Sequence, residues 1–224
     1  MCGRYSFTKE ERDDISEQEI NELMKELENK YPAYKVPDEV FPATYAPVMI
    51  SKPNNEMELV LMKWGFRERL KEYQDGHFLR EFEKDIFNTR IESVKKIPYW
   101  FDAIKNKRCL VPANRWFEWN SDGAGKNKIK YALGLKEKSI FYFAGLWRET
   151  VDQSTGELIQ EFSIIMTDAN DLVRQVHTKG RMPSILDNKY ESLTWLNHSN
   201  SLDSVINIAQ KTYPQELMWV KVSA

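Results

Sequence analysis

Hydrophobic residues recur at helical spacing early in the chain. Ile20, Leu23 and Leu27 lie three or four residues apart, which is the period of one helix face. Residues 16–19 read Ser-Glu-Gln-Glu, the spacing of a capping box, in which a serine begins the helix and a glutamate three residues later returns to it. The pattern predicts a helix over residues 16–30 whose apolar stripe packs on the core.

Alternation of apolar and polar residues predicts that most of the remaining chain forms strands. In residues 57–64 it places Met57, Leu59 and Leu61 on one face. Strands are expected over residues 1–6, 57–64, 87–92, 108–112, 114–119, 131–135, 139–147, 158–167 and 217–222. The three strands between residues 131 and 167 should form an antiparallel meander.

Helices and loops complete the predicted fold. Further helices are expected over residues 97–107, 168–177, 188–196 and 202–209, and helical surface pieces over the charged residues 67–85. Four prolines between residues 31 and 47 favour an extended surface loop. The fold class is therefore α+β: a single domain over residues 1–224 with a mostly antiparallel, partly barrel-like β-sheet and peripheral helices.

Composition and charge narrow the possible partners. The chain is 42% hydrophobic and 29% charged, as in soluble globular proteins, and its net charge of −2 requires a local basic patch for any contact with nucleic acid. Two cysteines and three histidines, in no paired ligand spacing, argue against a metal site or a disulfide framework, and we expect no cofactor. The longest apolar run, residues 140–146, is too short to span a bilayer. We expect a cytoplasmic protein without membrane contact.

The first candidate for chemistry is Cys2. Removal of Met1 would leave Cys2 with a free α-amine, which titrates near ~8, beside a thiol, which titrates near ~8.5. Such a 1,2-aminothiol can condense with an aldehyde and close a thiazolidine ring. Its thiol can also attack an amide, as in N-terminal-nucleophile hydrolases. A third possibility is that Cys2 is a small buried hydrophobe at the start of a strand.

Residues 87–92 place three polar side chains on one strand face. If this segment is extended, Asn88, Arg90 and Glu92 point the same way, and Thr89 lies on the opposite face. The polar residues either line a functional surface or form a solvated strand face with an Arg90–Glu92 ion pair.

Glu118 and His177 are candidates for proton transfer. Glu118 stands between Phe117 and Trp119, and apolar surroundings disfavour the charged carboxylate and raise its pKa. The alternative is an exposed glutamate on a strand. His177 is expected at the C-terminal end of a helix, where a histidine is either a cap or a general acid or base.

The motifs together resemble one family, the SRAP (SOS response-associated peptidase) domain proteins. The similarity runs from Cys2 to about Met218 and does not include residues 67–86. It rests on Met-Cys-Gly-Arg-Tyr at the start, Tyr45-Ala46-Pro47, Lys63-Trp64-Gly65-Phe66, Asn88-Thr89-Arg90-Ile91-Glu92, Trp116-Phe117-Glu118-Trp119, and His177 with Arg181-Met182-Pro183.

The resemblance implies a protein that captures abasic sites in single-stranded DNA through Cys2. It implies that Asn88 orients the amine or the sugar, Glu118 activates the amine, and His177 helps to open the deoxyribose ring. The DNA-binding positions that it implies are Arg4, Arg90, Arg181, Trp64, Pro47 and Thr167. A protein of this kind would associate with the nucleoid when engaged on DNA.

Three other functions remain open from the sequence. Glutamine amidotransferases also begin Met-Cys-Gly, although the Asn-Gly loop and Gly-Asp pair of their glutamine site are not found here. A thiol peptidase could use Cys2 and His177 as its pair. A non-catalytic module could bind single-stranded DNA by stacking bases on tryptophans, with Cys2 inert.

Overall fold

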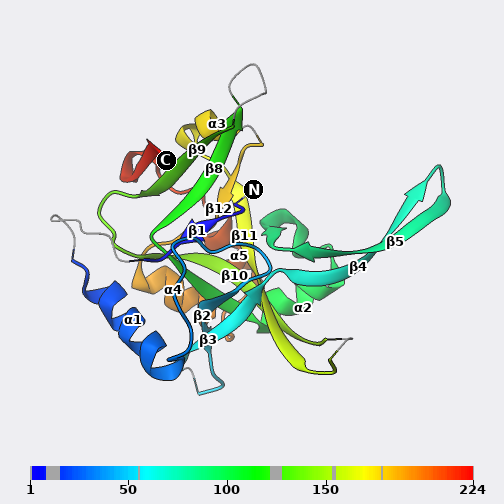
Figure 1. The fold of residues 1–224 in the computed structure, drawn as a ribbon, viewed down its shortest axis with the longest axis horizontal. Helices are drawn as coiled ribbons and strands as arrows, with labels where there is room; N and C mark the ends of the chain where they lie inside the picture. The colour runs from blue at the N-terminus through cyan, green and yellow to red at the C-terminus, as the bar shows by residue number, and fades with distance from the viewer. Residues whose placement is uncertain are drawn as a thin grey trace.

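Two β-sheets packed on one another form the body of the molecule in the computed structural model (Figure 1). The structure describes residues 2–8, 16–54, 56–121, 128–152, 155–177 and 179–223. The strands of the larger sheet are β2 (Tyr45–Ser51), β3 (Met57–Trp64), β6 (Asn88–Arg90), β7 (Arg108–Ala113), β10 (Phe141–Val151), β11 (Leu158–Asp168), β12 (Arg181–Pro183) and β13 (Ile185–Leu186).

Five strands of the larger sheet pair in a closed ring, as in a barrel. The pairings run from β11 to β3, β2, β7 and β10, and β10 pairs again with β11. Most pairings are antiparallel, but β3 and β6 both run parallel to β11. The prediction of an α+β domain with a mostly antiparallel, partly barrel-like sheet is confirmed.

The smaller sheet carries the N-terminus. Its order is β1 (Tyr5–Ser6), β8 (Arg115–Ser121), β9 (Lys128–Leu135) and β14 (Met218–Val222). Tyr5 pairs with Trp116 of β8 on one side and with Val40 on the other, so the two-residue strand β1 is held along both edges. Because β9 belongs to this sheet, the predicted meander of three strands is wrong. Only β10 and β11 are neighbours as expected.

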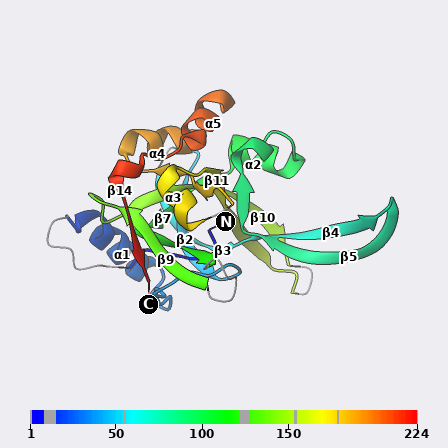
Figure 2. The same ribbon diagram turned by 90° about the horizontal axis from the view of Figure 1, so that it is seen from above.

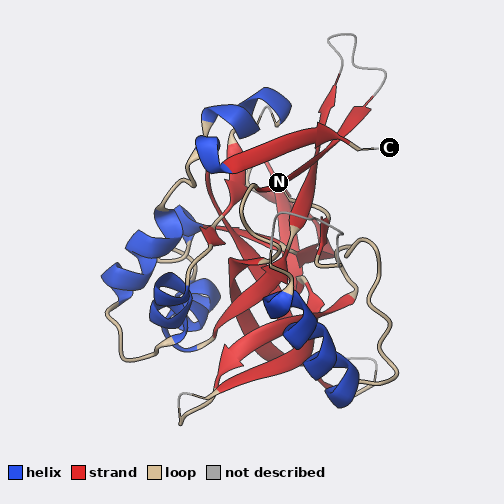
Figure 3. Cartoon of the chain, turned by 90° about the vertical axis from the view of Figure 1, so that its left-hand side faces the viewer, coloured by secondary structure: helices blue, strands red, loops and turns tan. Residues whose placement is uncertain are grey.

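Helices cover the outside of the sheets (Figures 2 and 3). They are α1 (Gln18–Lys30), α2 (Pro98–Asn106), α3 (Asp171–Val176), α4 (Lys189–Leu196) and α5 (Leu202–Gln210), with short 3-10 turns η1 (Ile91–Ser93) and η2 (Gln215–Leu217). The five predicted helices outside residues 67–85 are confirmed. The capping box is not: α1 begins after Glu17, which makes no side-chain cap. No helix in the described ranges is both long and apolar enough to cross a membrane.

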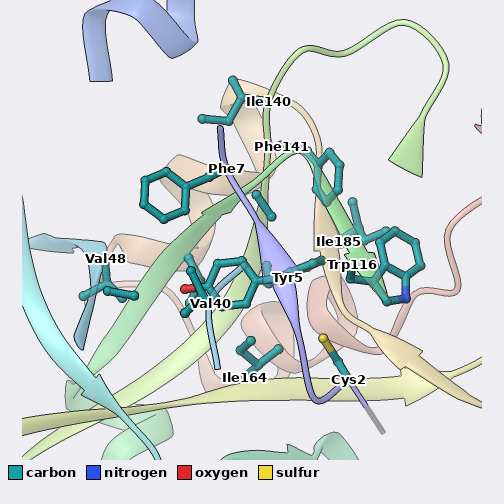
Figure 4. Packing of buried hydrophobic residues seen from close by; sticks show 14 of the residues in the cluster. Cys2, Tyr5, Phe7, Val40, Val48, Trp116, Ile140, Phe141, Ile164 and Ile185 are labelled. Carbon is teal, nitrogen blue, oxygen red and sulfur yellow. The ribbon is translucent and has the colours of Figure 1, made fainter. Parts of the chain in front are cut away.

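The core between the sheets is rich in aromatic rings around Tyr5 (Figure 4). The Tyr5 ring meets Trp64 edge-on at 5.1 Å and Phe143 at 6.0 Å between centroids. A second apolar cluster lies under α2, α4 and α5. The first cluster contains Cys2, so the start of the chain is part of the core of the domain.

Residues 67–85 form a β-hairpin and not the predicted helical pieces. Strands β4 (Phe66–Gln74) and β5 (His77–Ile86) project from the body (Figure 1) and meet at Asp75-Gly76, whose φ angles of 51° and 80° suit a tight two-residue hairpin turn. Opposite charges face each other across the strands, including Arg67 with Asp85. In the sequence, the Asp75-Gly76 pair is the signal that indicates a β-hairpin turn here.

Strands β2 and β3 form a regular antiparallel pair. Residues 31–47 were expected to be an extended loop, yet Pro47 lies within β2 and sits opposite Leu61 of β3. In β3 the predicted alternation does not separate a buried face from an exposed one: Leu59 is fully buried and Met57, on the same face, is 49% exposed, while Met62 and Trp64 of the other face are fully buried.

Arg108 joins two helix ends to the barrel. Its side chain is 1% exposed and donates to backbone carbonyls at the ends of two helices, α2 and α4. The acceptors are the carbonyl oxygens of Ile104, Lys105, Trp195 and Asn197. Burial lowers its pKa to about 10. The guanidinium thus satisfies carbonyls that each helix leaves unpaired at its C-terminus.

We predict that Arg108→Met lowers the free energy of unfolding by about 2–4 kcal/mol, because it leaves buried carbonyl groups without a donor. Urea denaturation followed by circular dichroism measures the change. The control is Lys107→Met, which removes a neighbouring cation whose ion pair with Glu149 is partly exposed and which should cost below about 1 kcal/mol. Equal losses in the two variants would contradict the role given to Arg108.

Candidate active site

Cys2 lies at the buried beginning of β1. Its side chain is 0% exposed, its thiol donates to the Arg4 carbonyl at 3.5 Å, and its own carbonyl accepts from Asn88 Nδ2 at 2.7 Å. Burial raises the pKa of the thiol well above its ordinary value, and the charge of Glu118 raises it further. Cys2 is therefore held as a neutral thiol whose backbone is fixed by a side chain from β6.

Glu118 projects from β8 into the space between the sheets. It is 2% exposed, and burial raises its pKa to about 7. The sequence prediction of a raised pKa has the right direction but an incomplete cause. On a strand, Phe117 and Trp119 point to the opposite face from Glu118, where Lys130 lies over the Phe117 ring and Arg4 over the Trp119 ring. The carboxyl is desolvated by the facing elements and not by its neighbours in sequence.

His177 completes a buried pair with Glu118. It is the residue that ends α3, its backbone N–H donates to the Val173 carbonyl at 2.8 Å, and its Nδ1 lies 3.3 Å from Glu118 Oε2. Burial lowers the pKa of His177 to about 4. Both shifts favour the neutral forms, so near neutral pH the contact is better described as a carboxyl and an imidazole that share a proton than as an ion pair.

The four residues come from four separate parts of the fold. Asn88 is placed by the parallel pairing of β6 with β11, where it stands opposite Ile164. Glu118 comes from the smaller sheet, His177 from the end of α3, and Cys2 from the chain start. The arrangement brings a nucleophile, a backbone anchor and a proton-exchanging pair to one side of the core, which is the equipment of acid–base assisted nucleophilic chemistry.

The three arginines expected to bind DNA lie in different environments. Arg4 forms an ion pair with Glu39 at 3.3 Å, with side chains 37% and 22% exposed. Arg181 bonds both carboxylate oxygens of Glu92 and pairs with Asp168 at 3.3 Å. Arg90 is exposed at the end of β6 and makes no ion pair with another described residue.

Glu92 does not lie on the expected strand face. The strand β6 ends at Arg90, and the 3-10 turn η1 then redirects the chain. Thr89 and Ile91 are buried, and Glu92 bonds Arg181 and does not form the alternative ion pair with Arg90.

Trp64, Pro47 and Thr167 are buried and support the fold. Trp64 is 0% exposed, donates through Nε1 to the Phe87 carbonyl at 2.8 Å and stacks on Phe162. Thr167 donates to the Gln210 carbonyl at 2.8 Å. Their side chains are buried in this conformation, and their contact with DNA stays a prediction drawn from the resemblance.

Two residues near the site were not singled out from the sequence. Glu39 and Phe41 hold the Arg4 side chain, Glu39 by its ion pair and Phe41 by its ring, whose centroid is 4.5 Å from the guanidinium carbon. The loop that carries them pairs with β1 through a long-range bridge between Val40 and Tyr5, which no local spacing indicates. Across the described part of the chain, no group of three or more His, Cys, Asp or Glu side chains could hold a metal ion.

Comparison with known proteins finds consistent similarity. The family model described as "SOS response associated peptidase (SRAP)" matches residues 1–224. Abasic site processing protein YoqW of Bacillus subtilis is 30% identical over 202 residues, which cover 90% of this chain and 82% of that protein. Abasic site processing protein HMCES of Gallus gallus is 27% identical over 69% of this chain and 52% of its own.

Solved structures share the same fold. A protein from Bacteroides thetaiotaomicron superimposes with a TM-score of 0.75 at 26% identity and covers 99% of this chain and 91% of its own. A second, from Bordetella bronchiseptica, has a TM-score of 0.70 at 17% identity and covers both chains fully, which shows a common fold.

The buried Glu118 carboxyl predicts a pH-dependent stability. Its pKa of about 7 lies above the ordinary ~4.3 of an unfolded chain, so its contribution is complete below the unfolded value and is lost as the pH rises through about 7. Relative to Glu118→Gln, the wild type should lose on the order of a few kcal/mol of unfolding free energy between pH 5 and pH 8.

Urea denaturation at a series of pH values measures this difference. Glu149→Gln is the control, because the pKa of that exposed carboxyl is lowered by a hydrogen bond from Lys107 and its loss should not reproduce the trend. Comparison with Glu118→Gln also separates the effect from that of His177, whose lowered pKa acts in the opposite direction as the pH falls through about 4. Parallel curves for wild type and Glu118→Gln would show that the carboxyl is charged in the fold.

Proposed function

The chain belongs to the SOS response associated peptidase family, and on this basis we propose that it processes abasic sites in DNA through Cys2. The curated relatives named above are abasic site processing proteins. The observation that carries the proposal is the placement of the N-terminal cysteine: Asn88 holds the Cys2 carbonyl at 2.7 Å, and the charge of Glu118 acts on the Cys2 thiol inside the core.

The proposed reaction is capture of the abasic aldehyde in a thiazolidine. After removal of Met1, the Cys2 α-amine attacks the aldehyde carbon of the open-chain sugar, and loss of water gives an imine. The thiol then adds to the imine carbon, its proton passes to the nitrogen, and a five-membered ring closes. Only residue 2 of this chain can present both nucleophiles to one carbon, because the Cys109 amine lies within a peptide bond.

Glu118 and His177 supply the proton transfers of this sequence. Departure of water needs an acid, and ring closure needs a base for the thiol, whose pKa is raised by burial. A carboxyl with a pKa of about 7 can serve in both directions at neutral pH. His177, neutral and 3.3 Å away, accepts or returns the proton and assists the opening of the sugar ring.

We further propose that the substrate is single-stranded, so that the sugar can leave the helix and reach a thiol enclosed by two sheets. Arg90, which is exposed and forms no ion pair within 4 Å with another described residue, is the proposed phosphate contact beside Asn88. Arg4 and Arg181 are offset by Glu39, Glu92 and Asp168. The contact is therefore local, in keeping with a net charge of −2.

The decisive experiment follows the covalent adduct. Intact mass and a denaturing gel, after incubation with an oligonucleotide that carries one abasic site, should show removal of Met1 and a heat-stable shifted band. Cys2→Ala keeps the amine and loses the second nucleophile, so the stable band should disappear. A variant with a bulky residue inserted before Cys2 keeps the thiol but blocks the amine as an amide, and it should also form no adduct.

The control for thiol chemistry elsewhere is Cys109→Ala. Cys109 is a second fully buried thiol, 0% exposed, and its removal should leave the adduct unchanged. A stable adduct formed at the wild-type rate by the blocked variant or by Cys2→Ala would refute the mechanism. An ordinary thiol peptidase would keep its activity when the amine is blocked, so that variant also separates the two functions.

The arginine environments predict opposite effects on DNA affinity. Arg90→Ala should weaken binding to single-stranded DNA and reduce its salt slope by roughly one counterion. Glu92→Gln should strengthen binding, because it frees the Arg181 guanidinium from a two-point contact. Fluorescence anisotropy across a salt series measures both.

The control for Glu92→Gln is Glu22→Gln on α1, which makes the same change in net charge on an exposed helix face. Glu22→Gln should leave the affinity within about twofold of wild type. If both Gln variants strengthened binding equally, the effect would be one of overall charge and not of Arg181.

A further inference from the structure

Arg4 is the middle layer of an aromatic stack beside the N-terminus. Its guanidinium carbon lies 4.5 Å from the centroid of the Phe41 ring and 4.9 Å from that of Trp119. Arg4 is two residues from Cys2, so the two Cα atoms are at most about 7 Å apart. Trp119 is adjacent to Glu118 in β8. Because successive strand residues point to opposite faces, the stack lies beside β1 on the face of the smaller sheet opposite the Glu118 carboxyl.

The loop that carries Phe41 is held rigidly. Ala43 N–H donates to the Trp64 carbonyl at 2.7 Å, and Trp64 N–H donates to the Thr44 carbonyl at 2.9 Å. The Thr44 hydroxyl closes the turn onto the Phe41 carbonyl at 2.7 Å, and Ala43 adopts a left-handed φ of 66°. Because Trp64 is itself fully buried, the turn is fixed to the core.

Two large rings are exposed beside this turn. Phe41 is 41% exposed and Tyr45, the first residue of β2, is 48% exposed, although the hydrogen bonds around them leave the backbone little freedom. Loops that a rigid scaffold positions carry a large share of the binding residues of proteins. Phe41 already uses one face against Arg4, so its exposed area is available for one further flat group.

Arg4 serves this stack more than it serves as a free phosphate contact. Glu39 offsets its charge at 3.3 Å, and Lys130 bonds the other oxygen of the same carboxylate. The backbone of Arg4 is also fixed, since its carbonyl accepts from Phe117 N–H at 3.0 Å. The guanidinium packs against the Phe41 ring and holds it in place. Binding of a ligand to this ring therefore costs little extra conformational entropy.

We propose that Phe41 is a stacking platform for the nucleobase next to the abasic nucleotide. This inference rests on the proposed function and adds the group that positions the strand. A base is flat, is available one nucleotide from the reacting sugar, and stacks on an aromatic ring without regard to sequence. Only an unpaired base can offer its face to Phe41, so the same contact selects single-stranded over duplex DNA.

The test is a cycle that changes the protein and the DNA together. One single-stranded oligonucleotide carries a tetrahydrofuran residue, which mimics the abasic sugar but has no aldehyde, between ordinary nucleotides. A second carries tetrahydrofuran residues at the flanking positions as well. Phe41→Ala should weaken binding of the first by about 5- to 100-fold, the usual range for one base stacked on one ring. It should barely change binding of the second.

Matched variants show whether the ring itself matters. Phe41→Tyr keeps the ring and should bind the first oligonucleotide like wild type, whereas Phe41→Leu keeps an apolar side chain without a ring and should behave like Phe41→Ala. Tyr190→Ala removes an aromatic side chain that is 76% exposed on α4 and should change neither affinity.

Two results would overturn the proposal. Unchanged binding of the first oligonucleotide by Phe41→Ala and Phe41→Leu would show that no base stacks there. Equal weakening of both oligonucleotides would show that Phe41 acts only by holding Arg4. Tetrahydrofuran has no aldehyde and cannot react with Cys2, so these binding measurements do not depend on the covalent chemistry. If the proposed covalent chemistry is wrong, the sign is a missing adduct with aldehyde-bearing DNA.

Discussion

The position of Cys2 depends on contacts that a two-residue strand cannot make alone. Strand β1 is held by β8 on one edge and by Val40 on the other, and Asn88 of β6 fixes the carbonyl of Cys2. An isolated strand pairing of this length has almost no stability in water. The N-terminus is ordered only because segments 35 or more residues away close around it, so the site exists only when the whole domain has folded.

The same enclosure sets the charge state of the site. Burial raises the pKa values of Cys2 and Glu118 and lowers that of His177, so all three groups are driven toward their neutral forms. A thiol peptidase benefits from the opposite arrangement, in which a nearby cation lowers the thiol pKa and supplies thiolate at rest. A site that keeps the thiol neutral suits a mechanism in which an amine attacks first and the thiol is deprotonated only as the ring closes. A neutral resting thiol is thus compatible with the proposed aldehyde capture.

The sequence predicted the elements better than their partners. Helix α1 and strand β11 were evident from local periodicity, because a stripe of apolar residues marks the buried side of an element wherever it packs. The parallel pairing of β3 and β6 with β11 could not be predicted in this way, because the residues of a strand do not indicate which other strand it pairs with. The β4–β5 hairpin was missed because its charged residues satisfy one another across the strands, which leaves little apolar alternation to detect.

For the candidate site too, the sequence indicated the residues better than the contacts between them. Its residues were proposed one by one from motifs and from the resemblance, but the 3.3 Å contact between Glu118 and His177 joins positions 59 residues apart. Motif membership marked Trp64 for DNA contact, and the structure shows in addition that its ring is buried and that its backbone fixes the turn that carries Phe41. A motif shows that a residue is needed and does not show whether it touches the ligand or supports one that does.

Carboxylates beside Arg4 and Arg181 weaken the attraction of these arginines for DNA phosphates. Arg4 is paired with Glu39, and Arg181 is paired with Glu92 and Asp168, so little of their charge is free to attract phosphates at a distance. Proteins that track along DNA depend on many free cations and bind undamaged strands well. Here the proposed contacts are one base on one ring, the exposed Arg90 and one covalent bond, of which the covalent bond forms only where an aldehyde is present. Weak reversible contact with intact DNA and durable attachment at a lesion then follow from the same arrangement of side chains.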